Sequence, residues 1–479
     1  MTGLTADAST EAHIREHAMS PEISRPYQFK FGRLAVLVFC MAISVLWSNS
    51  FRAGDAKTGV GFMGDLREIY LGSRCVMHHQ DPYDPQTVLK VFLDAGGKFP
   101  PKEGPLRQEA LIVTTLQVNL PTTLFLLAPL ALLSWGAVEV IGTLITAISF
   151  LVAGYLIWDL CGSTNPKLFG CLVGFVLANC VQLLAIGNIA GFVVSASLIA
   201  TWCFLKNRWT AVGAVLFALC LLIKPHDVGF VWLYFVLAGG VPRKRALQAL
   251  AITCVIGAAA AMWIAPASPH WYHELHENHT IVSQPGSTSD PSIAGITSGK
   301  VGAILDLQAA LSVIIHNPRA YNLVSYLIAG PLLAIWLWIT LRRRNTQEQT
   351  LLGLAAVAVL TLLPIYHRPY DAKMLMLAFP ACAMLWRSAG LRRWVSIGLT
   401  AAGLLITCEI VQAILLVWTG VAPAGPESDA KSTAISVLPP VILLAMGCFF
   451  LWEYVRSRPT ENASTTFVSE KDLALTSAS

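Results

Sequence analysis

The chain of 479 residues is 55% hydrophobic and only 13% charged, with a formal net charge of +5. Because soluble domains carry about 25% charged residues, this composition excludes a soluble globular protein. The basic residues fall in short segments between apolar runs, a pattern typical of topology signals rather than of a nucleic-acid-binding surface. We therefore expect an all-α, polytopic membrane protein that contacts membrane lipids and binds no nucleic acid.

The first apolar run, residues 34–50, follows a long polar segment and is typical of an uncleaved first helix rather than of a signal peptide. The Ser- and Thr-rich C-terminal segment is typical of disorder. The predicted division of the chain is a cytoplasmic tail at 1–32, a membrane domain at 33–455 with outer loops at 51–135 and 266–318, and a disordered cytoplasmic tail at 456–479.

Basic residues on the cytoplasmic side must be separated by an even number of crossings. Three apolar stretches, 34–50, 110–133 and 136–158, lie between the basic residues Arg33 and Lys167. The middle stretch contains two prolines, so we interpret it as a re-entrant or interfacial helix, which is tolerated where it packs against protein. A true crossing that places Lys167 outside is the alternative.

Further apolar stretches predict the rest of the bundle, for a total of about twelve crossings. Several of them are about 15 residues long and span about 22 Å, whereas the hydrocarbon core is about 30 Å thick. The hinges between these short helices are therefore expected below the outer surface, where irregular backbone must line a cavity. The predicted helices lie at 168–186, 189–205, 209–223, 226–241, 246–265, 321–341, 350–365, 372–389, 394–419 and 434–454.

Three of these hinges, at 187–188, 224–227 and 366–371, carry polar and charged residues. A charge at membrane depth costs about 2.5–3.5 kcal/mol, so each one needs a physical reason. We expect a pocket in the outer half of the bundle, with these residues on its rim and floor. The predicted lining consists of Asn188, Lys224, His226, His367, Arg368, Tyr370, Asp371 and Lys373.

The cationic members of this set suit a bound anion, most naturally a phosphate. Charge-assisted hydrogen bonds to phosphate contribute about 1.5–3 kcal/mol each. Two simpler interpretations stay open: Arg368 pairs with Asp371, and Lys373 extends to the membrane interface. The predicted phosphate-binding residues are Lys224, His367, Arg368 and Lys373.

The largest group of carboxylates follows the first apolar run and includes Asp65. A carboxylate in a partly desolvated pocket can accept the proton of a hydroxyl group, so Asp65 is a candidate general base. A helix cap or an ion pair with Arg67 or Arg74 is the structural alternative. Asp81 and Asp84 flank a Pro-Tyr pair, which favours a turn rather than catalysis.

A second polar stretch is rich in histidine. His273 and His276 could share a helix face with Glu277, but the spacing matches no strong metal-binding signature. An interfacial helix anchored by Trp271 and Tyr272 is favoured instead. We therefore expect neither a metal site nor a cofactor.

Taken in chain order, several of these motifs resemble those of glycosyltransferase family 87, a group of GT-C-type membrane glycosyltransferases. The resemblance extends over about residues 34–455. Two motifs depart from the family pattern: Gly187-Asn188-Ile189-Ala190 stands where Gly-Gln-x-Asn is usual, and Asn119-Leu120-Pro121 stands where Tyr-Pro-Pro is usual. The residues that carry the resemblance are Asp65 with Tyr70, Asp81-Pro82-Tyr83, the segment 128–133, Gly187-Asn188, Ile223-Lys224-Pro225 and the segment 366–371.

The resemblance implies a GT-C-type bundle whose pocket opens to the extracytoplasmic side of the plasma membrane. It implies transfer of a hexose, mannose by family precedent, from a polyprenyl-phosphate-linked donor to a lipid or glycan acceptor. Asp65 would correspond to the essential carboxylate of the first outer loop, with Tyr70 in the same pocket. His367 would lie where the donor phosphate is held.

Two other classes of protein stay open from the residues alone. A secondary transporter would also place buried charges at broken helices, but it should show an internal inverted repeat, and none is evident in the sequence. A lipid-binding or lipid-flipping protein would need the pocket without the base.

Overall fold

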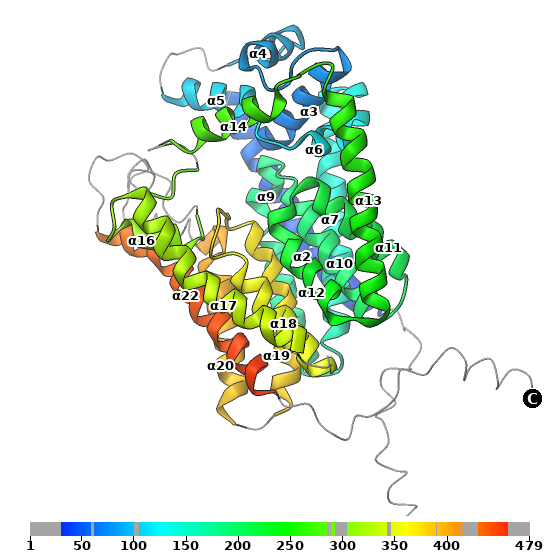
Figure 1. The fold of residues 1–479 in the computed structure, drawn as a ribbon, viewed down its shortest axis with the longest axis vertical. Coiled ribbons are helices and arrows are strands. Elements are labelled where there is room, and N and C mark those ends of the chain that lie inside the picture. Colours follow the sequence, from blue (N-terminus) through cyan, green and yellow to red (C-terminus); the bar gives the residue numbers. More distant parts are fainter. Residues whose placement is uncertain are drawn as a thin grey trace, which may run out of the picture.

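Figure 1 shows the computed structural model, whose all-helical fold confirms the predicted class. The described residues contain no β-strand. They are residues 30–457 except for 59–61, 100–104, 285–286, 288, 293–303, 343–345, 389, 412–413 and 415–429. The two predicted tails therefore lie almost entirely outside the described residues.

Six helices within the described ranges are long and apolar enough to cross a membrane. Large apolar side chains on their outer faces, such as Val255 and Met262 at 70% and 71% exposure, suit contact with lipid tails. The predicted total of about twelve crossings stays a prediction. The six candidate spans come from α2 (Phe31–Thr58), α7 (Trp135–Leu160), α8 with α9 (Pro166–Ala178 and Val181–Ile186), α13 (Gly240–Ile264), α17 (Pro318–Arg342) and α22 (Ala430–Arg456).

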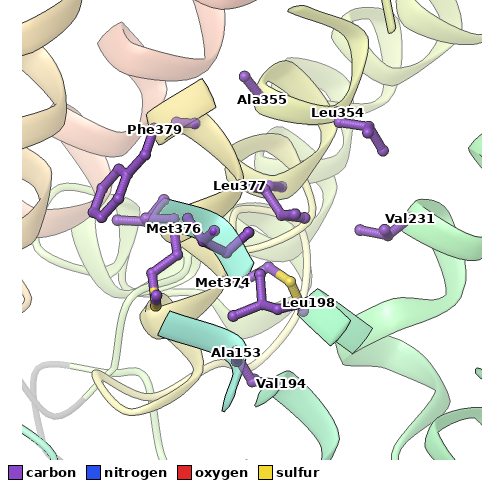
Figure 2. Packing of buried hydrophobic residues seen from close by; sticks show 14 of the residues in the cluster. Ala153, Val194, Leu198, Val231, Leu354, Ala355, Met374, Met376, Leu377 and Phe379 are labelled. Atoms are coloured by element: carbon purple, nitrogen blue, oxygen red, sulfur yellow. The ribbon is translucent and has the colours of Figure 1, made fainter. Parts of the chain in front are cut away.

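Shorter helices fill the middle of the bundle. The helix α18 (Gln347–Leu360) is buried along almost its whole length, as expected for a helix that is apolar on every side. Leu198, Met374 and Phe379 from neighbouring elements pack close to it in the core shown in Figure 2. Further short elements are α10 (Ala190–Leu205), α11 (Thr210–Ile223), α12 (Pro225–Ala238), the 3₁₀ helix η2 (Asp371–Leu377), α19 (Ala378–Trp386) and α20 (Leu391–Ile406). Of these, η2, α19 and α12 pack against α18.

A group of helices from both predicted outer loops, which we call the cap, lies at one end of the molecule (Figure 1). Asn278 joins the two loops, because its side-chain amide donates to the backbone carbonyls of Tyr83 and Gln117, each at 3.1 Å. The cap consists of α3 (Gly64–Met77), α4 (Pro85–Asp94), α5 (Pro105–Thr115), α6 (Pro121–Leu127), the 3₁₀ helix η1 (Ala128–Leu132) and α14 (Trp271–Val282).

The predicted helix 168–186 coincides with the candidate span Pro166–Ile186, but it is interrupted between α8 and α9. Ser44 of α2 supplies the hydrogen bonds that the helix gives up there. Its hydroxyl donates to the carbonyl of Leu177 at 2.7 Å and accepts from the backbone N–H of Cys180 at 3.0 Å. A tertiary contact of this kind leaves no local signal in an apolar segment.

Two other predicted segments are also divided. The stretch 110–133 separates into α5 and α6, because Pro121 cannot continue a helix from the preceding residues and instead begins a new one. Its re-entrant placement stays a prediction. The predicted helix 372–389 starts as the 3₁₀ helix η2 before it continues as α19.

Candidate functional site

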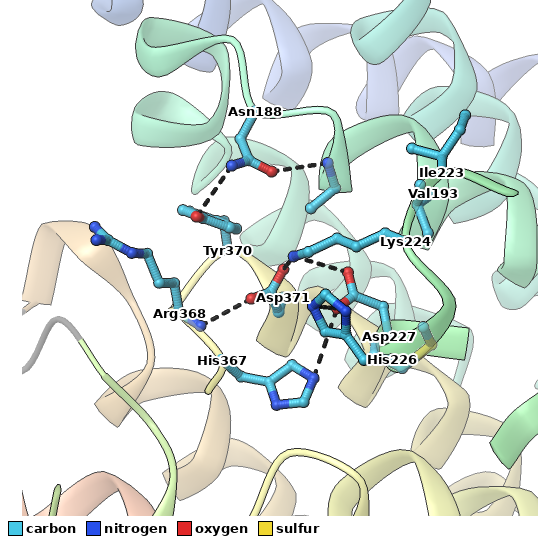
Figure 3. Close-up of polar contacts among 12 residues, drawn as sticks. Asn188, Val193, Ile223, Lys224, His226, Asp227, His367, Arg368, Tyr370 and Asp371 are labelled. Atoms are coloured by element: carbon cyan, nitrogen blue, oxygen red, sulfur yellow. Dashed lines mark hydrogen bonds and ion pairs between the residues drawn. The ribbon is translucent and has the colours of Figure 1, made fainter. Parts of the chain in front are cut away.

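The three predicted hinges meet in one polar cluster, drawn in Figure 3. Gly187 ends α9 in a left-handed conformation with φ 66°. Lys224 separates α11 from α12 and precedes a proline, which disfavours helical backbone at the lysine. The third hinge joins α18 to η2 and is held at its back by a backbone hydrogen bond from Leu305 to the carbonyl of His367, at 2.9 Å. The first two hinges are therefore encoded by a glycine and a proline, and the third is held by a backbone hydrogen bond.

Asp65 lies in the first turn of α3, which docks onto the first hinge. The backbone N–H of Met63 donates to the carbonyl of Ala185 at 2.7 Å. A Cβ at Gly187 would lie 2.8 Å from the Cβ of Met63, so only glycine permits this approach. The docking brings Asp65 beside Asn188, whose amide nitrogen donates to its Oδ2 at 2.6 Å.

Asn188 connects the first hinge to the third. The same amide nitrogen donates to the hydroxyl of Tyr370 at 3.0 Å, and the amide oxygen accepts from the backbone N–H of Ala190 at 2.8 Å. A backbone N–H can only donate, so this last bond fixes which end of the amide faces Asp65. The predicted pocket residues Asn188 and Tyr370 are thereby joined to Asp65.

The carboxyl of Asp65 is only partly exposed. Burial raises the pKa of Asp65 above its usual range, although the hydrogen bond from Asn188 and the positive charges of Arg368 and Lys224 act in the opposite direction. A carboxylate with a raised pKa is a better proton acceptor than an exposed one, which suits a general base.

Lys224 is held between two carboxylates. Its ammonium lies 2.6 Å from Oδ1 of Asp371 and 3.0 Å from Oδ2 of Asp227, and 5.5 Å from the ring centre of Tyr370. Asp371 also accepts from the backbone N–H of Arg368 at 2.8 Å. The charge of Lys224 is therefore balanced within the protein.

The predicted alternative pairing of Arg368 with Asp371 takes place through the backbone rather than the guanidinium. The side chain of Arg368 turns away from the carboxylate in Figure 3. Its Nε donates to the hydroxyl of Tyr366, and its Cζ lies 5.6 Å from the centre of that ring. Arg368 as a whole is partly exposed, so we expect its guanidinium to be within reach of a bound anion.

Lys373 does not join the other cations. Its ammonium lies 2.8 Å from Oε1 of Glu409, and both side chains are buried. The other oxygen of Glu409 accepts from the backbone N–H of Gln182 at 2.9 Å. This pair ties η2 to α9 and to the segment after α20. The interpretation that Lys373 extends to the interface does not fit its burial either.

His226, Asp227 and His367 form a compact group of metal-ligand types. One ligand atom from each residue lies within 4.8 Å of the others. His367 is fully buried, whereas His226 exposes 39% of its side chain. This is the set of described residues that could hold a metal ion, and it differs from the predicted imidazole-rich stretch. There, His273 pairs with Glu277 on an exposed face of α14, at 3.2 Å.

Tyr70 lies on α3, and its hydroxyl makes its hydrogen bonds outside the polar cluster. Its hydroxyl donates to the carbonyl of Leu133 at 2.9 Å and accepts from Arg74 at 3.1 Å. It therefore holds α3 against the start of α7. Asp81 and Asp84 sit in turns as predicted: Asp81 accepts from the backbone of Tyr83 at 2.8 Å, and Asp84 caps α4.

Glu68 is a buried residue that the sequence analysis did not single out. It follows Asp65 by one helical turn and accepts from the backbone N–H of Val118 at 2.8 Å and from Asn119 at 2.9 Å. Burial, reinforced by the charge of Asp65, raises the pKa of Glu68 to about 8, against the effect of these hydrogen bonds. Its place one helical turn after Asp65, among the buried apolar residues Leu66 and Ile69 of this short helix, was the available signal.

The fold and the cluster together define a helical membrane protein in which charged residues converge at breaks between helices. The family model of glycosyltransferase family 87 matches residues 119–364, more than half of the chain. The chain therefore belongs to glycosyltransferase family 87 and is a membrane glycosyltransferase. The matched region contains Asn188 and Lys224. Comparison with curated proteins and with solved structures gave no match.

Proposed function

We propose that the protein transfers a hexose, with mannose as the favoured sugar, from a polyprenyl-phosphate-linked donor to a hydroxyl of a lipid or glycan acceptor. The observation that carries this proposal is the hydrogen-bonded path from Asp65 through Asn188 to Tyr370, the neighbour of Asp371. The path joins a half-buried carboxylate to a cationic hinge. A sugar transfer from a phosphate donor needs these two functions side by side.

In the proposed reaction, the acceptor oxygen attacks the anomeric carbon of the donor sugar and its proton passes to the carboxylate of Asp65. The bond from the anomeric carbon to the phosphate oxygen breaks, and its electron pair leaves with the polyprenyl phosphate. The raised pKa of Asp65 supports this role, since a general base works best when its pKa approaches the working pH.

The departing phosphate gains negative charge, and nearby cations would stabilise it. Arg368 is the best candidate, because the residue is partly exposed and its guanidinium can bind two phosphate oxygens at once. Lys224 would contribute its charge from the same cluster. His367 would contribute by holding the cluster in place, since its Nε2 lies 3.6 Å from Oδ1 of Asp227. Lys373 would act indirectly, since its pair with Glu409 holds η2 in place.

We also propose that the helices form a GT-C-type bundle in the plasma membrane, with the cap and the cluster on the extracytoplasmic side. The grouping of basic residues into short segments supports this orientation through the positive-inside rule. The domain division at 33–455 belongs to the same proposal.

Asp65→Asn tests the proposed base directly. Asparagine keeps the size of the side chain but cannot accept a proton, so transfer from a radiolabelled polyprenyl-phosphate hexose should fall about 10²- to 10⁴-fold. Binding of the donor should stay near the wild-type level. Asp94→Asn, at an exposed position on α4, is the matched control and should transfer normally. Full activity in Asp65→Asn would refute the assignment.

A second pair of variants tests the phosphate site. Arg368→Gln should weaken donor binding more than acceptor binding, because the phosphate that Arg368 would hold is the one that links the donor sugar to its polyprenyl chain. His367→Ala should also affect the donor more than the acceptor. An equal loss of both affinities would indicate a folding defect and would remove these residues from the proposed site.

A further inference from the structure

The group His226, Asp227 and His367 has the spacing of a tetrahedral metal site. Oδ1 of Asp227 lies 3.3 Å from Nε2 of His226 and 3.6 Å from Nε2 of His367. Ligands about 2.0–2.1 Å from a tetrahedral Zn²⁺ lie about 3.3–3.4 Å from one another. The two distances from Asp227 therefore match a shared ion to within a few tenths of an ångström, and all three ligand atoms lie within 4.8 Å of one another.

The hydrogen bonding of His367 directs the lone pair of its Nε2 toward a carboxylate oxygen, an arrangement that is repulsive unless a cation lies between them. Its Nδ1 lies 2.9 Å from the carbonyl of Ile365, which can only accept, so Nδ1 carries a hydrogen. In the neutral ring, Nε2 then turns a lone pair toward Oδ1 of Asp227. Among the described residues, neither of these two buried atoms has a hydrogen-bond partner. Histidines that bind metals characteristically donate the other ring N–H to a carbonyl or carboxylate.

The charges around the group also favour a bound cation. Lys224 contributes one positive charge, whereas Asp227 and Asp371 contribute two negative charges. With both imidazoles neutral, this part of the cluster carries a net charge of −1, and an uncompensated buried charge is costly. A divalent cation between Oδ1 and the two Nε2 atoms would reverse this charge to a net +1, which suits an additional bound anion, while Oδ2 stays with Lys224.

We propose that His226, Asp227 and His367 bind one divalent transition-metal cation, with Zn²⁺ as the best fit to two imidazoles and one carboxylate. The partial exposure of His226 provides a route to the site from solvent. Three protein ligands leave a coordination position for water or for an oxygen of a bound anion. The proposal concerns metal binding alone, and it holds whether or not the transfer reaction has the donor and acceptor proposed above.

The test uses the full chain without a polyhistidine tag, because such a tag binds the same ions. The protein is stripped with a chelator, incubated with Zn²⁺, desalted and analysed for metal by mass spectrometry. We expect about one tightly bound Zn²⁺ per chain. Co²⁺ in place of Zn²⁺ should give the visible absorption bands of a tetrahedral site. A wild-type protein that retains no metal would overturn the proposal.

Two variants locate the site. His226→Ala should weaken Zn²⁺ binding by at least about 10- to 100-fold, and its partial exposure limits the risk of misfolding. His367→Gln should have the same effect. His273→Ala removes a histidine from the exposed pair with Glu277 and is the matched control. Zn²⁺ binding that survives in both His226→Ala and His367→Gln, or that disappears in His273→Ala, would contradict this assignment.

Discussion

Asn188 donates from one amide nitrogen to two oxygens, Oδ2 of Asp65 at 2.6 Å and the hydroxyl of Tyr370 at 3.0 Å. Its amide oxygen is occupied by the backbone N–H of Ala190. The amide cannot turn over without replacing attractive contacts by repulsive ones. The proposed base is therefore held by a group that is itself fixed to the backbone of the hinge.

Asn188→Ala removes a hydrogen bond that favours the charged form of Asp65. The pKa of Asp65 should rise further. If transfer requires ionised Asp65, the acid limb of the pH profile of kcat/KM should shift to higher pH. Tyr370→Phe leaves the Asn188–Asp65 bond intact and should shift this limb less. A profile that falls uniformly, with the same shape, would mean that Asn188 has only a structural role.

Glu68 should make the stability of the cap depend on pH. Its pKa is about 8 in the folded protein and 4.5 in the reference state, so between these values the folded state binds more protons than the unfolded one. The contribution of Glu68 to the free energy of unfolding is then greatest below pH 4.5. It declines toward pH 8, at most by about 1.4 kcal/mol per pH unit.

Glu68→Gln keeps an oxygen that can accept from Val118 and Asn119 but does not titrate. In the wild-type protein the thermal midpoint should fall between pH 5 and pH 8. In this variant the midpoint, followed by tryptophan fluorescence, should fall less steeply over the same pH range. Equal slopes in the two proteins would show that another group controls the pH dependence.

Gly187→Ala should displace the helix that carries Asp65 without changing any polar side chain of the site. The added Cβ would lie 2.8 Å from the Cβ of Met63, at a residue with φ 66°, and the left-handed conformation alone costs alanine about 1 kcal/mol. We expect a lower thermal midpoint together with reduced transfer, because α3 carries Asp65. Gly136→Ala, where a Cβ meets nothing within 4 Å, is the control and should preserve both.

Lys373 and Glu409 should behave as a structural pair. Removal of either partner leaves a buried charge alone, so Lys373→Met and Glu409→Gln should each destabilise the protein, by about 3–5 kcal/mol when the remaining charge is fully buried. The double variant should recover part of this loss. Disruption of the partly exposed pair Lys206–Asp159 should change the midpoint far less. Additive losses in the double variant would exclude a direct coupling.

The hinges of the site could be predicted because their signals are local. Helices too short to span the membrane placed polar residues at 187–188, 224–227 and 366–371 in one region, and the structure brings those hinges together (Figure 3). Asp65 could be singled out as an acidic residue after the first apolar run, and it lies beside Asn188.

The pairing of charges within the site could not be predicted in this way. The closeness of Lys373 to His367 in the sequence groups it with the other cations, but η2 directs its side chain to Glu409 instead. No sequence pattern distinguishes Asp227 from the other hinge residues, and its contact with His367 depends on a tertiary approach of distant segments. Tertiary packing decides which carboxylate pairs with which cation. Local sequence patterns carry no information on that packing.

The side-chain amide of Asn278 holds carbonyls that lie 195 and 161 residues away in the sequence, at Tyr83 and Gln117. The helix α14 cannot lift away without breaking both of these bonds. Gln117 in turn donates to the carbonyl of Glu68 on α3 at 3.0 Å, so a displacement of α14 is transmitted to the helix that bears Asp65. We therefore expect that a displacement of α14 which keeps these bonds also moves the proposed base, so that access under the cap and proton transfer would be mechanically coupled.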